Sequence, residues 1–206
     1  MPTAAHLRDK LRAASTPDST ETWRVRLHRA ISWLARSERE HHDPDARFMF
    51  QWVALNAAYA REFGRGETER ERARQFLDVL IGLDPARRLH GALFGQFTGP
   101  IRTLLDNRFV FEPFWTALRE HDASNAWETA FAGSRKKALA SIMQGDTATL
   151  LSVVFDRLYV LRNQLVHGGA TWSSQVNRAQ VNYLKAFNQD PSFHPLLPIP
   201  ITTTRK

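Results

Sequence analysis

The sequence predicts an all-α fold, and three observations carry this prediction. Apolar residues recur at three- and four-residue spacing in several segments, and one segment is apolar on nearly every side. No segment alternates apolar and polar residues as a half-buried strand does. Glycine, proline and short polar runs separate the helical segments. We therefore expect a helical bundle without a substantial sheet.

The first part of the chain predicts three helices joined by polar breaks. They cover roughly 20–40, about 45–62 after the break HHDPD, and about 67–82. In the third helix glutamate and arginine stand three apart, as in Glu71 and Arg74, which indicates a solvated face of neighbouring opposite charges. GLDPARR and FTGP predict loops near 82–88 and 97–100.

The next part predicts short helices and then one long apolar helix. The short helices cover 101–107 and 111–121, and Ser124 can cap another that runs to about 142. Asp146 is a good N-cap for the long helix 147–167. Because that helix is apolar on nearly every side, we expect it to be the buried centre of the fold.

Composition narrows the class of protein. The net charge of +7 permits a polyanionic partner without requiring one, and Arg135, Lys136 and Lys137 form the least compensated basic cluster. The absence of cysteine excludes disulfides and thiolate chemistry and fits a reducing compartment. The N-terminus lacks the apolar core of a signal peptide, and no apolar run approaches the roughly 20 residues that span a bilayer. We therefore expect a cytoplasmic protein with no membrane partner.

Arg162 stands among apolar neighbours near the end of the long helix. Its helical neighbours are Leu158, Tyr159, Leu165 and Val166. Burying an unpaired guanidinium costs several kcal/mol, so Arg162 needs an acceptor. That acceptor is either a structural carboxylate, such as that of Asp156 or Glu62, or backbone carbonyls, or the phosphate of a ligand.

His167 follows Arg162 by five residues, just before a double glycine. On an ideal helix this spacing separates two side chains by about 140°. The two converge only if the helix loosens before His167, or if a second copy of the site brings its own residues. The helix dipole favours a cationic imidazole at a helix C-terminus, which suits proton transfer near neutral pH. Alternatively, His167 only caps the terminal carbonyls.

The segment LYVLRNQLVHGGA, 158–170, strongly resembles the signature of the HEPN superfamily (higher eukaryotes and prokaryotes nucleotide-binding). Members are all-α domains, commonly dimeric, and many are metal-independent ribonucleases. Their motif is an arginine, often followed by a polar residue, and then a histidine; Arg162, Asn163 and His167 match it. RFMFQWVALNAAYA, 47–60, is similar to an early helix of bacterial members. The resemblance departs at Gly169, where toxins controlled by tyrosine modification often carry tyrosine.

The resemblance implies a metal-independent endoribonuclease that cleaves RNA by 2′-hydroxyl transesterification, acting as a toxin or antiviral defence effector. It implies catalysis by Arg162, Asn163 and His167, no cofactor, and a homodimer with a composite active site. RNA is the expected substrate, and an antitoxin or regulatory protein is a further expected partner. The alternative is a non-catalytic HEPN module that binds RNA, a nucleotide or a partner protein. A purely structural helical scaffold is the third reading.

Four further residues are candidates for substrate binding or for supporting the catalytic groups. Asn56 is an amide on an apolar stripe and therefore needs partners, either at the motif or on a neighbouring helix. Gln51 is a second amide on the same predicted helix. Asn177 and Arg178 follow the motif closely, and Arg178 can reach a phosphate or form a plain salt bridge. HHDPD contains two histidines and two aspartates, but no recognisable metal-ligand spacing accompanies it, so no metal is expected.

These expectations give a single domain, 1–206, with a HEPN-like core. The core covers about 45–190 and closes with a last helix that Ser174 can cap. A helical extension, 1–44, precedes the core. The proline-rich end, 191–206, is expected to be an extended tail.

Overall fold

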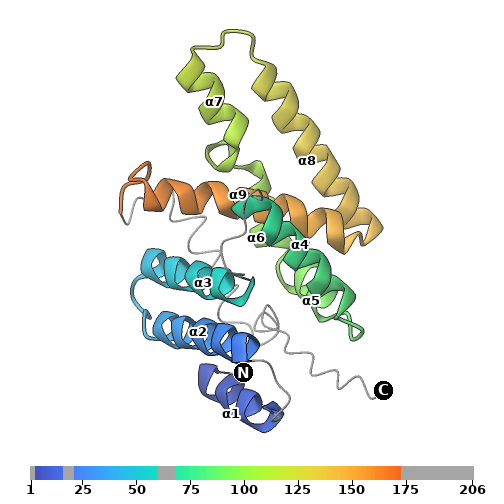
Figure 1. Cartoon of the computed structure of the whole chain (residues 1–206). Coiled ribbons are helices and arrows are strands. Elements are labelled where there is room, and N and C mark those ends of the chain that lie inside the picture. Colours follow the sequence, from blue (N-terminus) through green and yellow to red (C-terminus); the bar gives the residue numbers. More distant parts are fainter. Residues whose placement is uncertain (1–2, 16–20, 60–67, 173–206) are drawn as a thin grey trace. The chain divides into compact units, whose positions relative to one another are not determined.

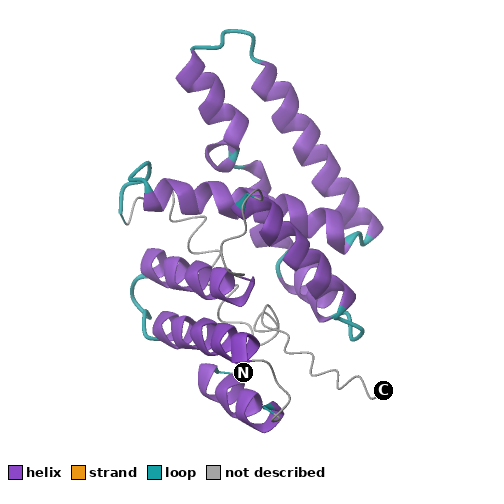
Figure 2. Cartoon of the chain, in the orientation of Figure 1, coloured by secondary structure: helices purple, strands orange, loops and turns teal. Residues whose placement is uncertain are grey.

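In the computed structural model, which describes residues 3–15, 21–59 and 68–172, all regular secondary structure is helical (Figure 2). No strand occurs among these residues, so the all-α prediction is confirmed for them. The described residues divide into two compact units, one that ends at Ala86 and one that begins at Arg87. The predicted last helix from Ser174 and the tail 191–206 lie outside the described residues.

The first unit is a layered set of helices. α1 (Ala4–Ala14), α2 (Glu21–Glu38) and α3 (Pro44–Tyr59) lie side by side, with α2 packing against both others (Figure 1). α4 (Glu69–Gly82) packs against α3. The predicted helices 20–40, 45–62 and 67–82 are therefore present. One buried apolar cluster joins α1, α2 and α3; it comprises Ala4, Leu7, Leu11, Ile31, Leu34 and Ala54.

Side-chain caps fix where helices of this unit begin. The Thr3 hydroxyl accepts from the His6 N–H at 3.3 Å, and the Ala4 N–H donates to the Glu38 carboxylate at 2.8 Å, which ties α1 to the end of α2. At α4, Thr68 and Glu71 form a capping box. Hydrogen bonds from the Thr68 backbone and hydroxyl lower the pKa of Glu71. Glu71 therefore caps the N-terminus of α4 and also interacts electrostatically with Arg74.

The second unit begins with short helical pieces. They are α5 (Arg88–Gly91), the π-helical turn η1 (Ala92–Gln96), α6 (Thr98–Asp106), the 3₁₀ turn η2 (Arg108–Val110), α7 (Glu112–Glu120) and α8 (Ala126–Gln144).

Two local predictions for this unit need correction. The loop predicted at 97–100 is wrong, because α6 begins at Thr98 and includes Pro100. Proline is tolerated in the first turn because the N–H groups there have no intrahelical acceptor. At α8 the N-cap is Asn125, in the left-handed region with φ 55°, rather than Ser124. The Ser124 hydroxyl still accepts from the Ala126 N–H at 3.3 Å.

α9 (Thr147–Val166) is the central helix of this unit. Asp146 caps it as predicted, accepting from the Thr149 N–H at 3.0 Å. α9 packs against α6, η2 and α8, which confirms the predicted buried helix. Its buried residues are Leu150, Leu151, Val154, Phe155, Arg157, Val160 and Leu161.

The predicted single domain, with a core over about 45–190 after a helical extension, stays a prediction. Among the described residues one compact unit ends at Ala86 and the other begins at Arg87. α3 packs most extensively against α2, so it belongs to the same unit as the N-terminal helices.

Arg157 is the deeply buried arginine of α9, with only 2% of its surface exposed. Its guanidinium lies 4.3 Å from the Phe111 ring centroid and 5.1 Å from that of Phe131, and it donates to the Ser134 hydroxyl at 3.2 Å. Burial lowers the pKa of Arg157 to about 10, although the Asp156 charge opposes this shift. Arg157 therefore remains a cation at neutral pH, held by two aromatic rings.

We predict that Arg157→Met leaves the free energy of unfolding unchanged or raises it. Methionine keeps the apolar contacts with Phe111 and Phe131 and removes the desolvation cost of the charge. Arg157→Ala should lower the free energy of unfolding by about 2–5 kcal/mol, because it leaves a cavity between the rings. Denaturant titration followed by circular dichroism measures both. If the methionine variant is as unstable as the alanine variant, the charge itself stabilises the fold.

Candidate functional site

The last turn of α9 carries the Arg162, Asn163 and His167 motif. Arg162 and Asn163 are half-buried, whereas His167 is exposed. The Arg162 guanidinium donates to the Asn163 side-chain oxygen at 2.8 Å and lies 5.9 Å from the Tyr159 ring centroid. The arginine is therefore oriented in part by residues of its own helix. Glu62, one carboxylate suggested as its partner, lies outside the described residues.

α9 is regular through Val166, and His167 is its C-cap. The His167 N–H donates to the Asn163 carbonyl at 2.9 Å, which is the helical i→i−4 bond, and His167 has φ −98° and ψ 12°. The backbone therefore does not loosen before His167. On an ideal helix the five-residue spacing separates the side chains of Arg162 and His167 by about 140°, so a second copy of the site stays the predicted way to bring such groups together.

The chain turns sharply after His167. Gly168 has φ +69°, in the left-handed region that favours glycine, and the Ala170 N–H donates to the Gln164 carbonyl at 3.1 Å. The turn folds the chain back over the last turn of α9. Among the described residues the His167 imidazole makes no hydrogen bond, so its ring does not cap the terminal carbonyls there.

Gln164 lies between the motif residues Asn163 and His167, and the sequence alone did not indicate a role for it. Its side-chain N–H donates to the Phe109 carbonyl at 2.5 Å, and the Trp115 indole N–H donates to the same oxygen at 2.7 Å. These two bonds fix η2 and the start of α7 to the end of α9. The available signal was an amide whose helical neighbours Val160 and Leu161 are apolar, because a partly buried amide needs a hydrogen-bond partner.

The supporting residues predicted on α3 belong to the first unit. The Asn56 side-chain N–H donates to Glu69 on α4 at 3.0 Å, and its oxygen accepts from the Tyr59 hydroxyl at 2.6 Å. Asn56 thus bonds a neighbouring helix, which is the second of the two alternatives. Gln51 is half-buried on the same helix. Asn177 and Arg178 lie outside the described residues.

Residues of the 135–137 basic cluster and of the HHDPD segment have partners within the fold. Arg135 forms an ion pair with Asp106, so this part of the 135–137 cluster is compensated. In HHDPD, the Asp43 carboxylate accepts from the Ala46 N–H at 2.9 Å at the start of α3, and Asp45 is buried. In 3–15, 21–59 and 68–172, no group of three or more histidine or carboxylate side chains is arranged to hold a metal ion.

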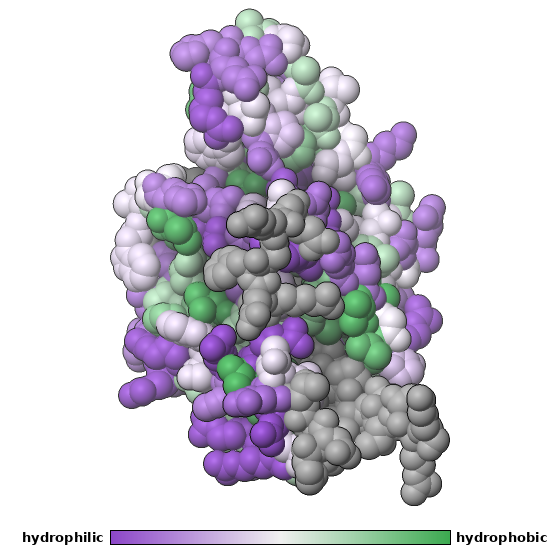
Figure 3. All heavy atoms as spheres, viewed as in Figure 1, coloured by the Kyte–Doolittle hydropathy of each residue, from purple (hydrophilic) through white to green (hydrophobic). Residues whose placement is uncertain are grey.

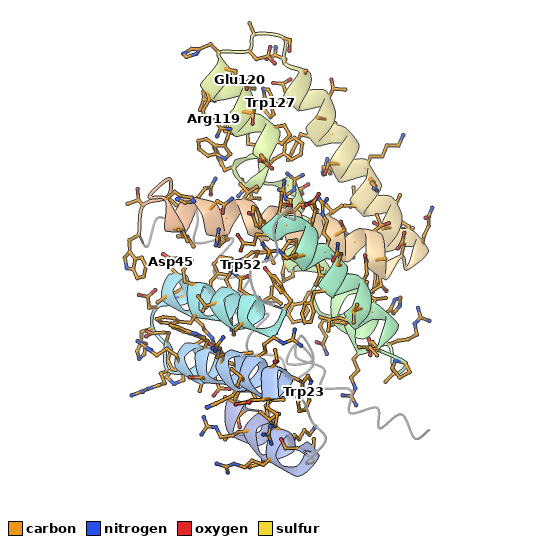
Figure 4. The ribbon with its side chains drawn as sticks, in the orientation of Figure 1. Trp23, Asp45, Trp52, Arg119, Glu120 and Trp127 are labelled. Atoms are coloured by element: carbon orange, nitrogen blue, oxygen red, sulfur yellow. The ribbon has the colours of Figure 1, made fainter. Side chains whose placement is uncertain are left out.

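A pocket of about 430 Å³ lies between α7 and α8, away from the motif. Figure 4 shows two of its lining residues, Glu120 and Trp127, on the two facing helices. Glu112 and Asp122 also line it, and the outer end of this hairpin is largely hydrophilic (Figure 3). Its three carboxylates would repel a phosphate. We therefore do not assign this pocket to the phosphate-binding chemistry expected of Arg162 and His167.

Comparison of the chain with family models, curated proteins and solved structures yields no significant match. Among the described helices, none is both long and apolar enough to cross a membrane. The assignment of a function therefore depends on the chemistry of the α9 end.

We predict that Gly168→Ala lowers the free energy of unfolding by about 1–2 kcal/mol, because alanine is strained at φ +69°. Gly169→Ala is the matched control. A Cβ at Gly169 meets its nearest atom, the Gln164 Cα, at an ordinary 3.5 Å. Denaturant titration of both variants measures the difference. Equal destabilisation by the two substitutions would contradict the assigned backbone constraint.

Proposed function

We propose that the chain is a metal-independent endoribonuclease of HEPN type, with a HEPN-like bundle formed around α9. The carrying observation is a half-buried Arg162 paired with Asn163, one turn before an exposed His167 whose ring makes no hydrogen bond among the described residues. A fixed guanidinium can bind phosphate, and a solvent-facing imidazole can exchange protons. The resemblance of the 158–170 segment to the HEPN signature supports the same chemistry.

The proposed reaction is transesterification within RNA. The 2′-oxygen bonds to the adjacent phosphorus while the bond from phosphorus to the 5′-oxygen breaks. The products carry a 2′,3′-cyclic phosphate and a 5′-hydroxyl. His167 accepts the proton of the 2′-hydroxyl and becomes an imidazolium. A His167 imidazolium then gives a proton to the leaving 5′-oxygen. Arg162 stabilises the charge that develops on the phosphate, and Asn163 orients the guanidinium.

A second copy of the chain completes the proposed site. α9 is regular through Val166, and the five-residue spacing on a regular helix directs Arg162 and His167 to different faces, which supports a site completed by a second chain. A two-fold interface between two α9 ends would place two arginines and two histidines along one groove. We therefore propose a homodimer with a composite active site.

The proposed biological role, as a toxin or antiviral effector in the cytoplasm held in check by an antitoxin or regulatory protein, comes from the resemblance alone. One observation favours a second candidate function. The divergence of Arg162 and His167 within one chain suits a non-catalytic module that binds RNA, a nucleotide or a protein through Arg162. The next experiments separate the two candidates.

We expect the purified chain to cleave single-stranded RNA in EDTA, and His167→Ala to lower the rate by about 10²-fold or more. His167 is exposed, so the variant should keep the fold and most of its RNA affinity. His28→Ala, at an exposed histidine of α2, is the matched control and should cleave normally. Gel analysis of RNA ends gives the readout. Cleavage that stops in EDTA, or persists in His167→Ala, would exclude the proposed mechanism.

Co-expression of Arg162→Ala with His167→Ala tests the composite site. Each variant alone should be nearly inactive, because it lacks either the phosphate-binding or the proton-transferring group. A mixed dimer retains one arginine and one histidine across the interface, so we expect it to cleave about tenfold or more faster than either variant. Different affinity tags isolate the mixed dimer. No recovery in an isolated mixed dimer, or a clean monomer mass for an RNA-cleaving sample, would rule out the composite site.

A further inference from the structure

An arginine and three aromatic rings gather where η2 meets α7. The Arg108 guanidinium lies 5.1 Å from the Phe109 ring centroid and 5.5 Å from that of Phe114. Phe114 packs edge-on against Phe109 at 5.6 Å and against Trp115 at 5.2 Å. We call these four residues the Arg108 cluster. Arg108 is exposed, and the three aromatic residues are half-buried rather than enclosed in the core.

The Arg108 cluster is fixed to the end of α9 that carries the motif. The Phe109 carbonyl accepts from both Trp115 and Gln164, so the cluster moves with the last turn of that helix. Gln164 and His167 stand three residues apart, which makes them neighbours on one helix face. The cluster is therefore held on the His167 side of α9.

Packing alone does not explain the position of Arg108. Among the described residues it makes no hydrogen bond or ion pair, and its contacts are the two rings. Val110 and Ala117 already provide the buried apolar surface of this corner. An arginine plane and partly exposed rings are the groups on which bases of single-stranded nucleic acids stack, and the cation also attracts the phosphates.

We propose that the Arg108 cluster is a nucleobase subsite, which stacks a base of single-stranded RNA beside the phosphate that His167 acts on. This inference rests on the proposed ribonuclease function and deepens it. Stacking explains how a site with few base-reading groups could hold a flexible strand, and it favours purines, which present the larger face. The subsite would set which nucleotide flanks the cleaved bond.

Binding to the full-length His167→Ala protein tests the subsite without cleavage. The probes are a fluorescent adenosine hexamer and the same hexamer made abasic at every position, measured by fluorescence anisotropy. We expect the abasic hexamer to bind about tenfold more weakly. Adding Arg108→Ala should weaken binding of the adenosine hexamer about tenfold and remove most of the difference between the probes.

Two further variants separate stacking from charge. Arg108→Lys keeps the charge without the planar guanidinium, so it should also lose much of the dependence on bases. Arg102→Ala removes an exposed arginine of α6 and should keep that dependence. Equal affinity for the two hexamers, no binding of either, or equal effects of Arg102→Ala and Arg108→Ala would overturn the subsite.

The experiments can refute the nucleobase subsite without refuting the ribonuclease proposal, and the reverse. A chain that binds bases through Arg108 but cuts no RNA keeps the subsite and loses the nuclease. Conversely, if the wild type cleaves RNA and Arg108→Ala alters neither affinity nor KM, the subsite is wrong and the nuclease stands. Circular dichroism of each variant establishes that a loss of binding does not come from unfolding.

Discussion

Burial of α9 is the constraint on which the second unit depends. The helix packs against α6, η2 and α8, and its buried side chains run from Leu150 to Leu161. Burial of that much apolar surface is the main free energy that holds such a unit together. At its C-terminal end, Val166 and the C-cap His167 are exposed. The motif is therefore built on the end of a rigid element, which is how a protein holds a site in a defined geometry.

Arg157 and Arg162 lie on the same helix but are buried to different extents. Arg157 is enclosed by Phe111 and Phe131, and burial lowers its pKa to about 10 without neutralising it. Its side chain contacts Phe111, just before α7, and Phe131 and Ser134 on α8. Arg162, five residues later, is half-buried and turned onto Asn163. Arg157 is therefore enclosed in the core, whereas Arg162, the proposed phosphate-binding residue, is partly accessible on the same helix.

The regularity of α9 also limits what one chain can do. Because the His167 N–H keeps its helical bond to Asn163, the divergence of Arg162 and His167 is a consequence of helix geometry. In the proposed reaction, this divergence is the reason that the site is assigned to two copies of the chain. On the His167 side, Gln164 joins the helix to Phe109 and Trp115, which gives this face aromatic character. The proposed chemistry and base binding thus share one helix end.

The sequence by itself determined the helical class, the buried helix with its Asp146 cap, and the glycine turn that follows it, because periodicity and capping are local. It also identified Arg162, Asn163 and His167 as the candidate chemistry. Only the tertiary structure decided that α3 packs with α2, that Arg157 is the arginine enclosed by rings, and that Asn56 bonds Glu69. Val153, Val154, Val160 and Leu161 surround Arg157 at helical spacing, yet its ring partners lie far away in sequence. Periodicity shows which face is buried, whereas the partner on that face depends on long-range packing.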